Sequence, residues 1–157
     1  MGTLIAIRHG QSQWNLENRF TGWTDVPLTE RGGADAALAA AALKNFTFDI
    51  AFTSRLERAT GTLDIILKEL GQTPEVIHDS ALNERHYGDL QGLNKAETVE
   101  KHGKEQVQLW RRSFATRPPN GESMQDCEER TWPFFQQYIL PHLAAGKTVI
   151  VAAHGNS

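Results

Sequence analysis

Short apolar runs without polar alternation recur along the chain and predict buried β-strands. The first run covers residues 3–7 (TLIAI), the last covers residues 148–153 (TVIVAA), and a third covers residues 48–53 (FDIAFT). Strands that are covered on both faces of a parallel sheet have this pattern, because neither face meets water. Residues 75–78 (EVIH) are more polar and are typical of an edge strand.

Helical patterns separate these predicted strands. Thr29 is a suitable N-cap for an Ala-rich helix that runs to about residue 44. Residues 54–57 (SRLE) fit a capping box, and apolar side chains then recur at helical spacing until Gly71. Glycine is the usual residue just beyond the end of a helix, so Gly71 is the predicted stop.

The second half of the chain alternates between loops and helices. Residues 82–94 are rich in Gly and polar side chains and are typical of a loop, whereas residues 95–114 form a polar helical segment. A Pro- and Gly-rich break follows at residues 116–121. We expect a longer helix from Ser123 toward residue 143, kinked near Pro133.

This alternation predicts an α/β fold with three layers, in which helices cover both faces of a mostly parallel sheet. Ligands of such sheets bind beyond the carboxyl ends of the strands. Arg8 and His9 follow the first predicted strand, and His154 and Gly155 follow the last, so we expect them to meet at one edge. We expect a single domain over residues 1–157, truncated at its C-terminus because no helix follows the last strand.

Composition and charge exclude several classes of protein. The chain has 16 Lys and Arg against 19 Asp and Glu, and this net charge of -3 does not favour nucleic acid or an anionic membrane as a partner. A single cysteine, Cys127, excludes an internal disulfide and fits a reducing compartment. No apolar run is long enough for a signal peptide or a membrane span, so we expect a cytoplasmic protein. Motifs for nucleotide, zinc or calcium binding are lacking, so we expect no metal.

The residues expected at the carboxyl edge of the sheet suit phosphoryl transfer. A neutral His9 is the candidate nucleophile, and Arg8, Arg58 and His154 are candidates to hold the transferring oxygens. Glu84, in a loop, is the candidate that protonates the leaving oxygen. Because charge spreads over the phosphoryl oxygens in the transition state, positioned cations supply most of the catalysis.

Each of these residues has a plainer explanation when taken singly. A histidine at a strand end is more often a structural hydrogen-bonding group than a catalyst. Arg58 fits a solvated helix arginine about equally well, and the pair Arg111 and Arg112 fits a solvated helix face better than a binding site. Residues 83–88 (NERHYG), however, combine an acid, a base, an imidazole and a phenol in one loop, and this combination favours a functional site.

The same residues resemble a known family. The sequence RHGQS at residues 8–12, the pair Trp14 and Asn15, and the later His154-Gly155 resemble the signature of the histidine phosphatase superfamily. Four further segments are similar to the 2,3-bisphosphoglycerate-dependent phosphoglycerate mutases. They are residues 18–23 (NRFTGW), 82–88 (LNERHYG), 91–97 (QGLNKAE) and 110–112 (WRR).

The resemblance implies a reaction and a set of site residues. The implied reaction interconverts 3-phosphoglycerate and 2-phosphoglycerate in glycolysis and gluconeogenesis, through a phosphohistidine at His9 that 2,3-bisphosphoglycerate primes, without a metal. The resemblance gives the phosphate pocket to Arg8, Arg58 and His154, and proton transfer to Glu84. The implied substrate-binding positions are Ser12, Asn15, Thr21, Gly22, Arg85, His86, Tyr87, Lys95, Arg111, Arg112, Gly155 and Asn156.

Two alternatives remain open from the sequence. One is a phosphatase of the same superfamily that acts on small phosphate esters, in which water takes the phosphoryl group from His9. The other is a non-catalytic fragment that binds phosphoglycerates, motivated by the expected C-terminal truncation. Residues 117–123 are shorter than the corresponding link in many family members, so the resemblance implies a compact variant. A homodimer is an expectation from the family alone.

Overall fold

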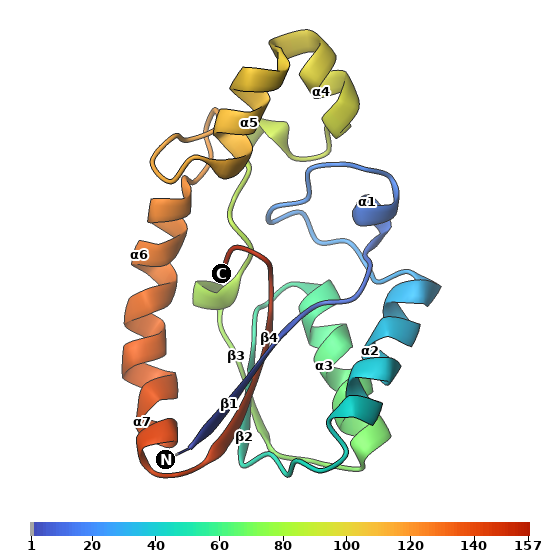
Figure 1. The fold of residues 1–157 in the computed structure, drawn as a ribbon, viewed down its shortest axis with the longest axis vertical. Helices are drawn as coiled ribbons and strands as arrows, with labels where there is room; N and C mark the ends of the chain where they lie inside the picture. Colours follow the sequence, from blue (N-terminus) through green and yellow to red (C-terminus); the bar gives the residue numbers. More distant parts are fainter. Residues whose placement is uncertain (1) are drawn as a thin grey trace.

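The computed structural model describes residues 2–157 and has a four-stranded sheet at its centre (Figure 1). The spatial order of the strands is β1-β4-β2-β3, and each neighbouring pair is parallel. The strands are β1 (Thr3–Arg8), β2 (Ile50–Thr53), β3 (Glu75–His78) and β4 (Thr148–Ala153). The predicted parallel sheet and the predicted edge position of residues 75–78 are confirmed.

The two strands that lead into His9 and His154, β1 and β4, differ in their burial. β4 lies between β1 and β2, and its residues from Val149 onward are buried. The prediction that β1 is buried on both faces is wrong, because β1 pairs only with β4 and lies at an edge. Its residues are exposed or half-buried, and 41% of Leu4 is accessible to solvent.

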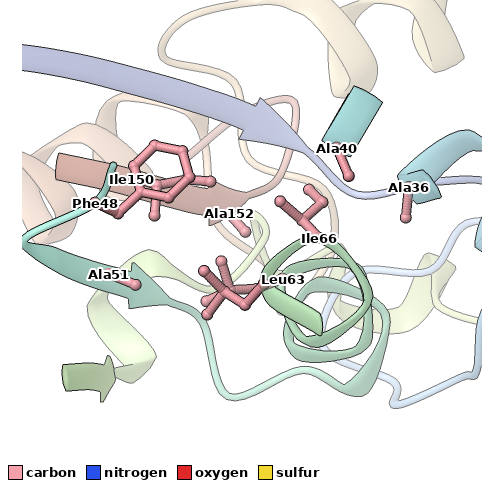
Figure 2. Close-up of a cluster of buried hydrophobic side chains, with 9 residues drawn as sticks. Ala36, Ala40, Phe48, Ala51, Leu63, Ile66, Ile150 and Ala152 are labelled. Atoms are coloured by element: carbon pink, nitrogen blue, oxygen red, sulfur yellow. The ribbon is translucent and has the colours of Figure 1, made fainter. Parts of the chain in front are cut away.

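One face of the sheet is covered by α2 (Glu30–Ala42) and α3 (Glu57–Leu70) (Figure 1). The predicted cap and stop are confirmed: the Thr29 side chain accepts a hydrogen bond from the Gly32 N–H, and Gly71 ends α3 with φ at 65°. Figure 2 shows the core on this face, where α2 contributes small residues and packs closely on α3. Its labelled members are Ala36, Ala40, Phe48, Ala51, Leu63, Ile66, Ile150 and Ala152.

The opposite face is covered by α6 (Met124–Phe134) and α7 (Leu140–Ala144). α6 begins directly after Ser123, in agreement with the predicted start, and Ser123 caps it through a capping box with Asp126. A π-helical turn over Phe135–Ile139 replaces the predicted simple kink. Pro133 and Pro141 flank this turn, and neither can donate the backbone hydrogen bond of a regular α-helix. Helices therefore lie on both faces of the sheet, which confirms the predicted three layers.

A small helical layer lies above the carboxyl ends of the strands (Figure 1). The predicted single helix over residues 95–114 is two helices, α4 (Lys95–His102) and α5 (Lys104–Arg112), because Gly103 adopts a φ of 83° between them. A short helix that the sequence did not indicate, α1 (Gln13–Leu16), follows β1. Within the predicted loop over residues 82–94, only a short 3-10 turn forms, at Gly88–Leu90. No helix among the residues described combines the length and apolar character required to cross a bilayer.

Truncation of Leu63 is expected to destabilise the fold. Leu63 is fully buried between α3 and the sheet, so Leu63→Ala leaves a cavity and lowers the unfolding free energy by about 2–5 kcal/mol. Leu38→Ala on α2 is the control, because 71% of Leu38 is exposed and its loss changes stability by less than about 0.5 kcal/mol. Urea unfolding of both variants measures the difference, and equal midpoints would contradict the assigned core.

Candidate functional site

The carboxyl ends of β1 and β4 meet below α4 and α5, and a pocket of about 240 Å³ opens there. This is the edge at which the sequence predicts the site. The pocket is lined by Arg8, His9, Asn15, Arg19, Phe20, Thr21, Gly22, Arg58, Glu84, Tyr87, Lys95, Arg111, Arg112, Gly155 and Asn156. All of the predicted site residues line it except Ser12, Arg85, His86 and His154.

His9 is held as a neutral imidazole at the end of β1. Its Nδ1 lies 2.7 Å from the Gly10 carbonyl oxygen, which can only accept, so Nδ1 carries the proton and Nε2 keeps its lone pair. Burial lowers the pKa of His9 from 6.5 to about 4; the hydrogen bond to Gly10 opposes this shift, and the charges of Arg58 and Arg8 add to it. At neutral pH the side chain is therefore an uncharged base with a free nitrogen.

Two glycines allow the loop after His9 to lie directly on α2. A Cβ atom at Gly10 would clash with the backbone of Gly32, and one at Gly32 would clash with the backbone of Gln11. The Gly10 N–H also donates to Thr62 Oγ1 at 3.1 Å, which fastens the loop to α3. The glycine after His9 thus serves close backbone packing, which rigidly places the imidazole.

His154 lies beside His9 although 145 positions separate them in the chain. The two ring centroids are 5.1 Å apart and the rings are inclined at 61°. His154 Nε2 lies 2.8 Å from Ser54 Oγ, and burial, with the nearby charge of Arg58 and Arg8, lowers the pKa of His154 well below its usual range. His154 is therefore also neutral, and it stands behind the pocket rather than on its lining surface.

Ser54 does not cap the following helix as the sequence predicts. α3 begins only at Glu57, and its N-cap residue Leu56 makes no side-chain capping bond. The Ser54 hydroxyl accepts from the Leu56 N–H at 3.2 Å, so its own hydrogen is available for His154. Ser54 orients an imidazole of the site, and no signal in the sequence distinguishes that role from helix capping.

Four cationic side chains of the pocket make no hydrogen bond with any other group in residues 2–157: Arg8, Lys95, Arg111 and Arg112. The repulsion among these cations affects the pKa of Lys95. Burial lowers the pKa of its ammonium group, and the charges of Arg111, Arg8 and Arg112 lower it further. A group of unpaired cations at this density favours an anionic ligand with more than one charge.

Arg58 is completely enclosed, which excludes the solvated helix face as its explanation. Only 1% of its surface is exposed, and its guanidinium donates to the carbonyl oxygens of Gly22 at 2.7 Å and Thr24 at 3.2 Å. Burial lowers the pKa of Arg58 to about 10, while the nearby carboxylates of Glu84 and Asp25 oppose the shift. The side chain stays charged at neutral pH and faces His9 from a fixed position.

Glu84 presents one carboxylate oxygen to the pocket and has the other fixed. Its Oε1 accepts from the Arg85 N–H and from Asn156 Nδ2, each at 2.8 Å. Oε2 makes no hydrogen bond within the part of the chain that the structure describes. Glu84 is 9% exposed and lines the same pocket as His9, where a proton can pass between Glu84 and a bound ligand.

Three positions predicted to contact substrate lie outside the pocket lining. Ser12 is fully buried and forms a capping box with Asn15 at the start of α1. Arg85 is fully buried and donates to the carbonyl oxygens of Trp110, Arg111 and Glu122. His86 uses Nδ1 to accept from the Gly88 N–H. These side chains hold the backbone that carries pocket residues, because each forms hydrogen bonds with backbone groups, although Arg85 Nε has no partner within residues 2–157.

Two further residues line the pocket without having been predicted. Arg19 donates to the Gly92 carbonyl oxygen at 2.7 Å and pairs with Glu17, and Phe20 forms part of the wall below Lys95. Both lie within residues 18–23, a segment that carries the family resemblance, so that segment was the available signal. In residues 2–157 no three His, Cys, Asp or Glu side chains cluster closely enough to hold a metal ion.

Acid is expected to destabilise the protein through the buried histidines. The folded-state pKa of His9 is about 4 and that of His154 is also lowered, whereas an unfolded histidine titrates near 6.5. Between these values the unfolded chain binds more protons, so the unfolding free energy falls as the pH falls from about 6.5 to about 4. Urea unfolding across this window measures the slope. His9→Asn should show a shallower dependence, and an unchanged slope would contradict the burial of a neutral His9.

Comparison with known families agrees with this geometry. The model of the histidine phosphatase superfamily (branch 1) matches residues 4–157. The chain belongs to the histidine phosphatase superfamily. The resemblance drawn from the motifs around His9 and His154 is thereby confirmed.

Relatives of known name are similar over the whole chain. A 2,3-bisphosphoglycerate-dependent phosphoglycerate mutase of Nitrobacter winogradskyi is 58% identical over 98% of this chain and 76% of its own length. Mutase 2 of the same name from Gloeobacter violaceus is 56% identical over 100% of this chain and 72% of its own length. The chain therefore spans about three quarters of the length of these relatives.

Solved structures of this superfamily have the same fold. A mycobacterial glucosyl-3-phosphoglycerate phosphatase in complex with VO3 gives a TM-score of 0.87 at 30% identity, over 98% of this chain and 75% of that one. A phosphoglycerate mutase from Bacillus anthracis gives 0.86 at 25% identity, with the same coverage of both chains. The fold is thus common to mutases and phosphatases, while the mutases of Nitrobacter winogradskyi and Gloeobacter violaceus named above are 58% and 56% identical to this chain.

Proposed function

We propose that this protein is an isomerase of glycolysis and gluconeogenesis that interconverts 3-phosphoglycerate and 2-phosphoglycerate through a phosphohistidine at His9. The observation that carries the proposal is the ring of unpaired cations around a neutral, buried His9. The substrate bears a phosphate and a carboxylate, and two separate anionic groups need more than one cationic partner. The names of the relatives at 56% and 58% identity support the same reaction.

The primer implied by those names fits the pocket. 2,3-Bisphosphoglycerate carries two phosphates and a carboxylate, and Arg8, Lys95, Arg111 and Arg112 have free donors to receive them. When bound, this molecule supplies the phosphoryl group that charges His9. His9 Nε2 is free to form the bond to phosphorus, because Nδ1 is held by the Gly10 carbonyl.

The other residues around His9 have separate roles in phosphoryl transfer. Arg8 and Arg58 stabilise the charge that develops on the phosphoryl oxygens, and Arg58 stays positive at neutral pH because its pKa is about 10. His154 shields and orients the imidazole of His9 from behind. Glu84 gives its proton to the oxygen that leaves phosphorus and takes one from the hydroxyl that attacks in the return step.

The wider proposal follows from the same arguments. The protein acts as a single domain in the cytoplasm on small phosphorylated acids, with no metal, and neither nucleic acid nor a membrane is its partner. A homodimer remains a prediction. A non-catalytic role in binding phosphoglycerates is the weaker alternative, because the nucleophile, the proton carrier and the cations are all present in one pocket.

A phosphatase is the second candidate function, supported by the TM-score of 0.87 with a phosphatase of the same superfamily. The two candidates differ in the acceptor of the phosphoryl group, which is water in one case and a phosphoglycerate hydroxyl in the other. Phosphorus NMR of the chain incubated with 3-phosphoglycerate and a trace of 2,3-bisphosphoglycerate separates them. The mutase predicts 2-phosphoglycerate with little inorganic phosphate. Steady phosphate release without the isomer would overturn the proposal in favour of the phosphatase.

A further inference from the structure

Arg130 of α6 makes an unusual number of contacts with one loop. Its Nη1 donates to the carbonyl oxygens of Ser80 at 3.1 Å, Ala81 at 2.7 Å and Asn83 at 3.2 Å, and its Nη2 donates to that of Glu84 at 3.4 Å. One guanidinium thus binds the backbone of the segment that ends at the candidate proton carrier. Arg130 itself does not line the pocket, so it cannot touch a ligand there.

Glu122 completes the support from the other side. Its carboxylate binds Arg130 through both oxygens, at 3.1 Å to Nε and 3.0 Å to Nη2. The same carboxylate accepts from the His86 N–H at 2.8 Å, and the Glu122 N–H donates to the His86 carbonyl. The ion pair of Arg130 and Glu122 therefore binds the backbone both before Glu84, at residues 80–83, and after it, at His86.

The carbonyl group of Glu84 is also held by the indole of Trp23, whose Nε1–H donates to it. The Arg130 guanidinium lies over the same indole ring, 5.5 Å from its centroid. The two groups that donate to the Glu84 carbonyl oxygen, Trp23 Nε1–H and Arg130 Nη2, are therefore also in contact with each other. A carboxylate mounted on a backbone fixed in this way has little freedom to drift from the geometry of proton transfer.

We propose that Arg130, paired with Glu122, is the positioning residue of Glu84 and sets the efficiency of its proton transfer. The inference rests on the proposed role of Glu84. Lysine cannot replace Arg130 in this role. Its ammonium group is a compact charge on a flexible chain, whereas the planar guanidinium group of arginine binds a carboxylate and several carbonyl groups at once. A positioning residue of this kind changes the reaction rate more than the binding of substrate.

Arg130→Lys is the main variant, and Glu122→Gln weakens the same pair with little change of shape. We expect Arg130→Lys to lower kcat for isomerisation by about 10-fold to 100-fold, because small displacements of a catalytic group cost that much. KM for 3-phosphoglycerate should stay within about twofold, since the cations of the pocket are untouched. Arg117→Lys is the matched control: Arg117 forms a bidentate pair with Asp126 at the start of α6 but has no contact with the Glu84 loop.

A second substrate tests whether the effect runs through the proton of Glu84. With p-nitrophenyl phosphate, His9 Nε2 forms a bond to phosphorus as the P–O bond breaks, and p-nitrophenolate leaves as an anion without a proton. The first-turnover release of p-nitrophenolate should therefore stay within about twofold in Arg130→Lys while isomerisation is slow. This contrast is not produced by a general loss of the pocket.

Three results would overturn the inference. Arg130→Lys could isomerise as fast as Arg117→Lys, it could lose both reactions equally, or it could raise KM while keeping kcat. Glu84→Gln, measured in parallel, separates this failure from that of the proposed function. A slow Glu84→Gln with a normal Arg130→Lys contradicts only the positioning role. A normal Glu84→Gln removes the proton-transfer role of Glu84 and the inference with it, whereas a wild-type chain that forms no isomer removes the proposed function.

Discussion

His9→Ala is expected to abolish formation of an acid-labile phosphoenzyme while leaving the fold intact. His9 is the one histidine of residues 2–157 that lines the pocket, and its Nε2 is a free nucleophilic nitrogen. Residual phosphoryl transfer should fall to the background set by the cations alone, a loss of at least about 10³-fold. Intact-mass spectrometry after a brief incubation with 2,3-bisphosphoglycerate measures the adduct directly.

The control for this experiment is His78→Ala. His78 is also a histidine at the end of a strand of the same sheet, but it is exposed and does not line the pocket. It should accept no phosphate, so the adduct of His78→Ala should equal that of the wild-type chain. Acid-labile phosphate that persists in His9→Ala would remove the nucleophile assignment, provided that circular dichroism shows the same helix and strand content.

Glu84→Gln is expected to slow isomerisation by about 10²-fold to 10⁴-fold, the usual cost of losing a general acid or base. The amide oxygen of glutamine can still accept from the Arg85 N–H and from Asn156 Nδ2, so the loop should keep its geometry. What is lost is the ability to release and take up a proton at the oxygen that faces the pocket. Rate measurements at saturating 3-phosphoglycerate report this loss in kcat.

Glu97→Gln is the matched control for Glu84→Gln. Glu97 lies on α4 two residues after Lys95, is exposed, and does not line the pocket. Its substitution removes the same charge from the same region of the protein. Near-normal kcat is expected for Glu97→Gln, and an equal kcat for the two variants would exclude Glu84 as the proton carrier.

Much of the fold could be predicted from the sequence, because buried elements have a characteristic pattern of apolar residues. The apolar runs at β2 and β4 and the helical spacing in α3 record which side chains face the core. The edge position of β1 left no such trace, since its side chains are as apolar as those of a buried strand. The π-helical turn between Pro133 and Pro141 was also hidden, because proline indicates a break without giving its form.

The candidate site also has features that the sequence predicts and features that only the tertiary structure shows. The sequence by itself determined which chemistry the chain carries, since an Arg-His-Gly at one strand end and a His-Gly at another must meet at the carboxyl edge of a parallel sheet. Only the tertiary structure decided which polar groups face a ligand and which bind backbone. Arg85 and Arg130 are cationic like Arg111, yet Arg85 binds carbonyl groups of distant segments, and Arg130 binds such carbonyl groups together with the Glu122 carboxylate. Hydrogen-bond partners far apart in the chain have no periodicity, so the roles of these arginines emerge only when the fold brings the carbonyls to them.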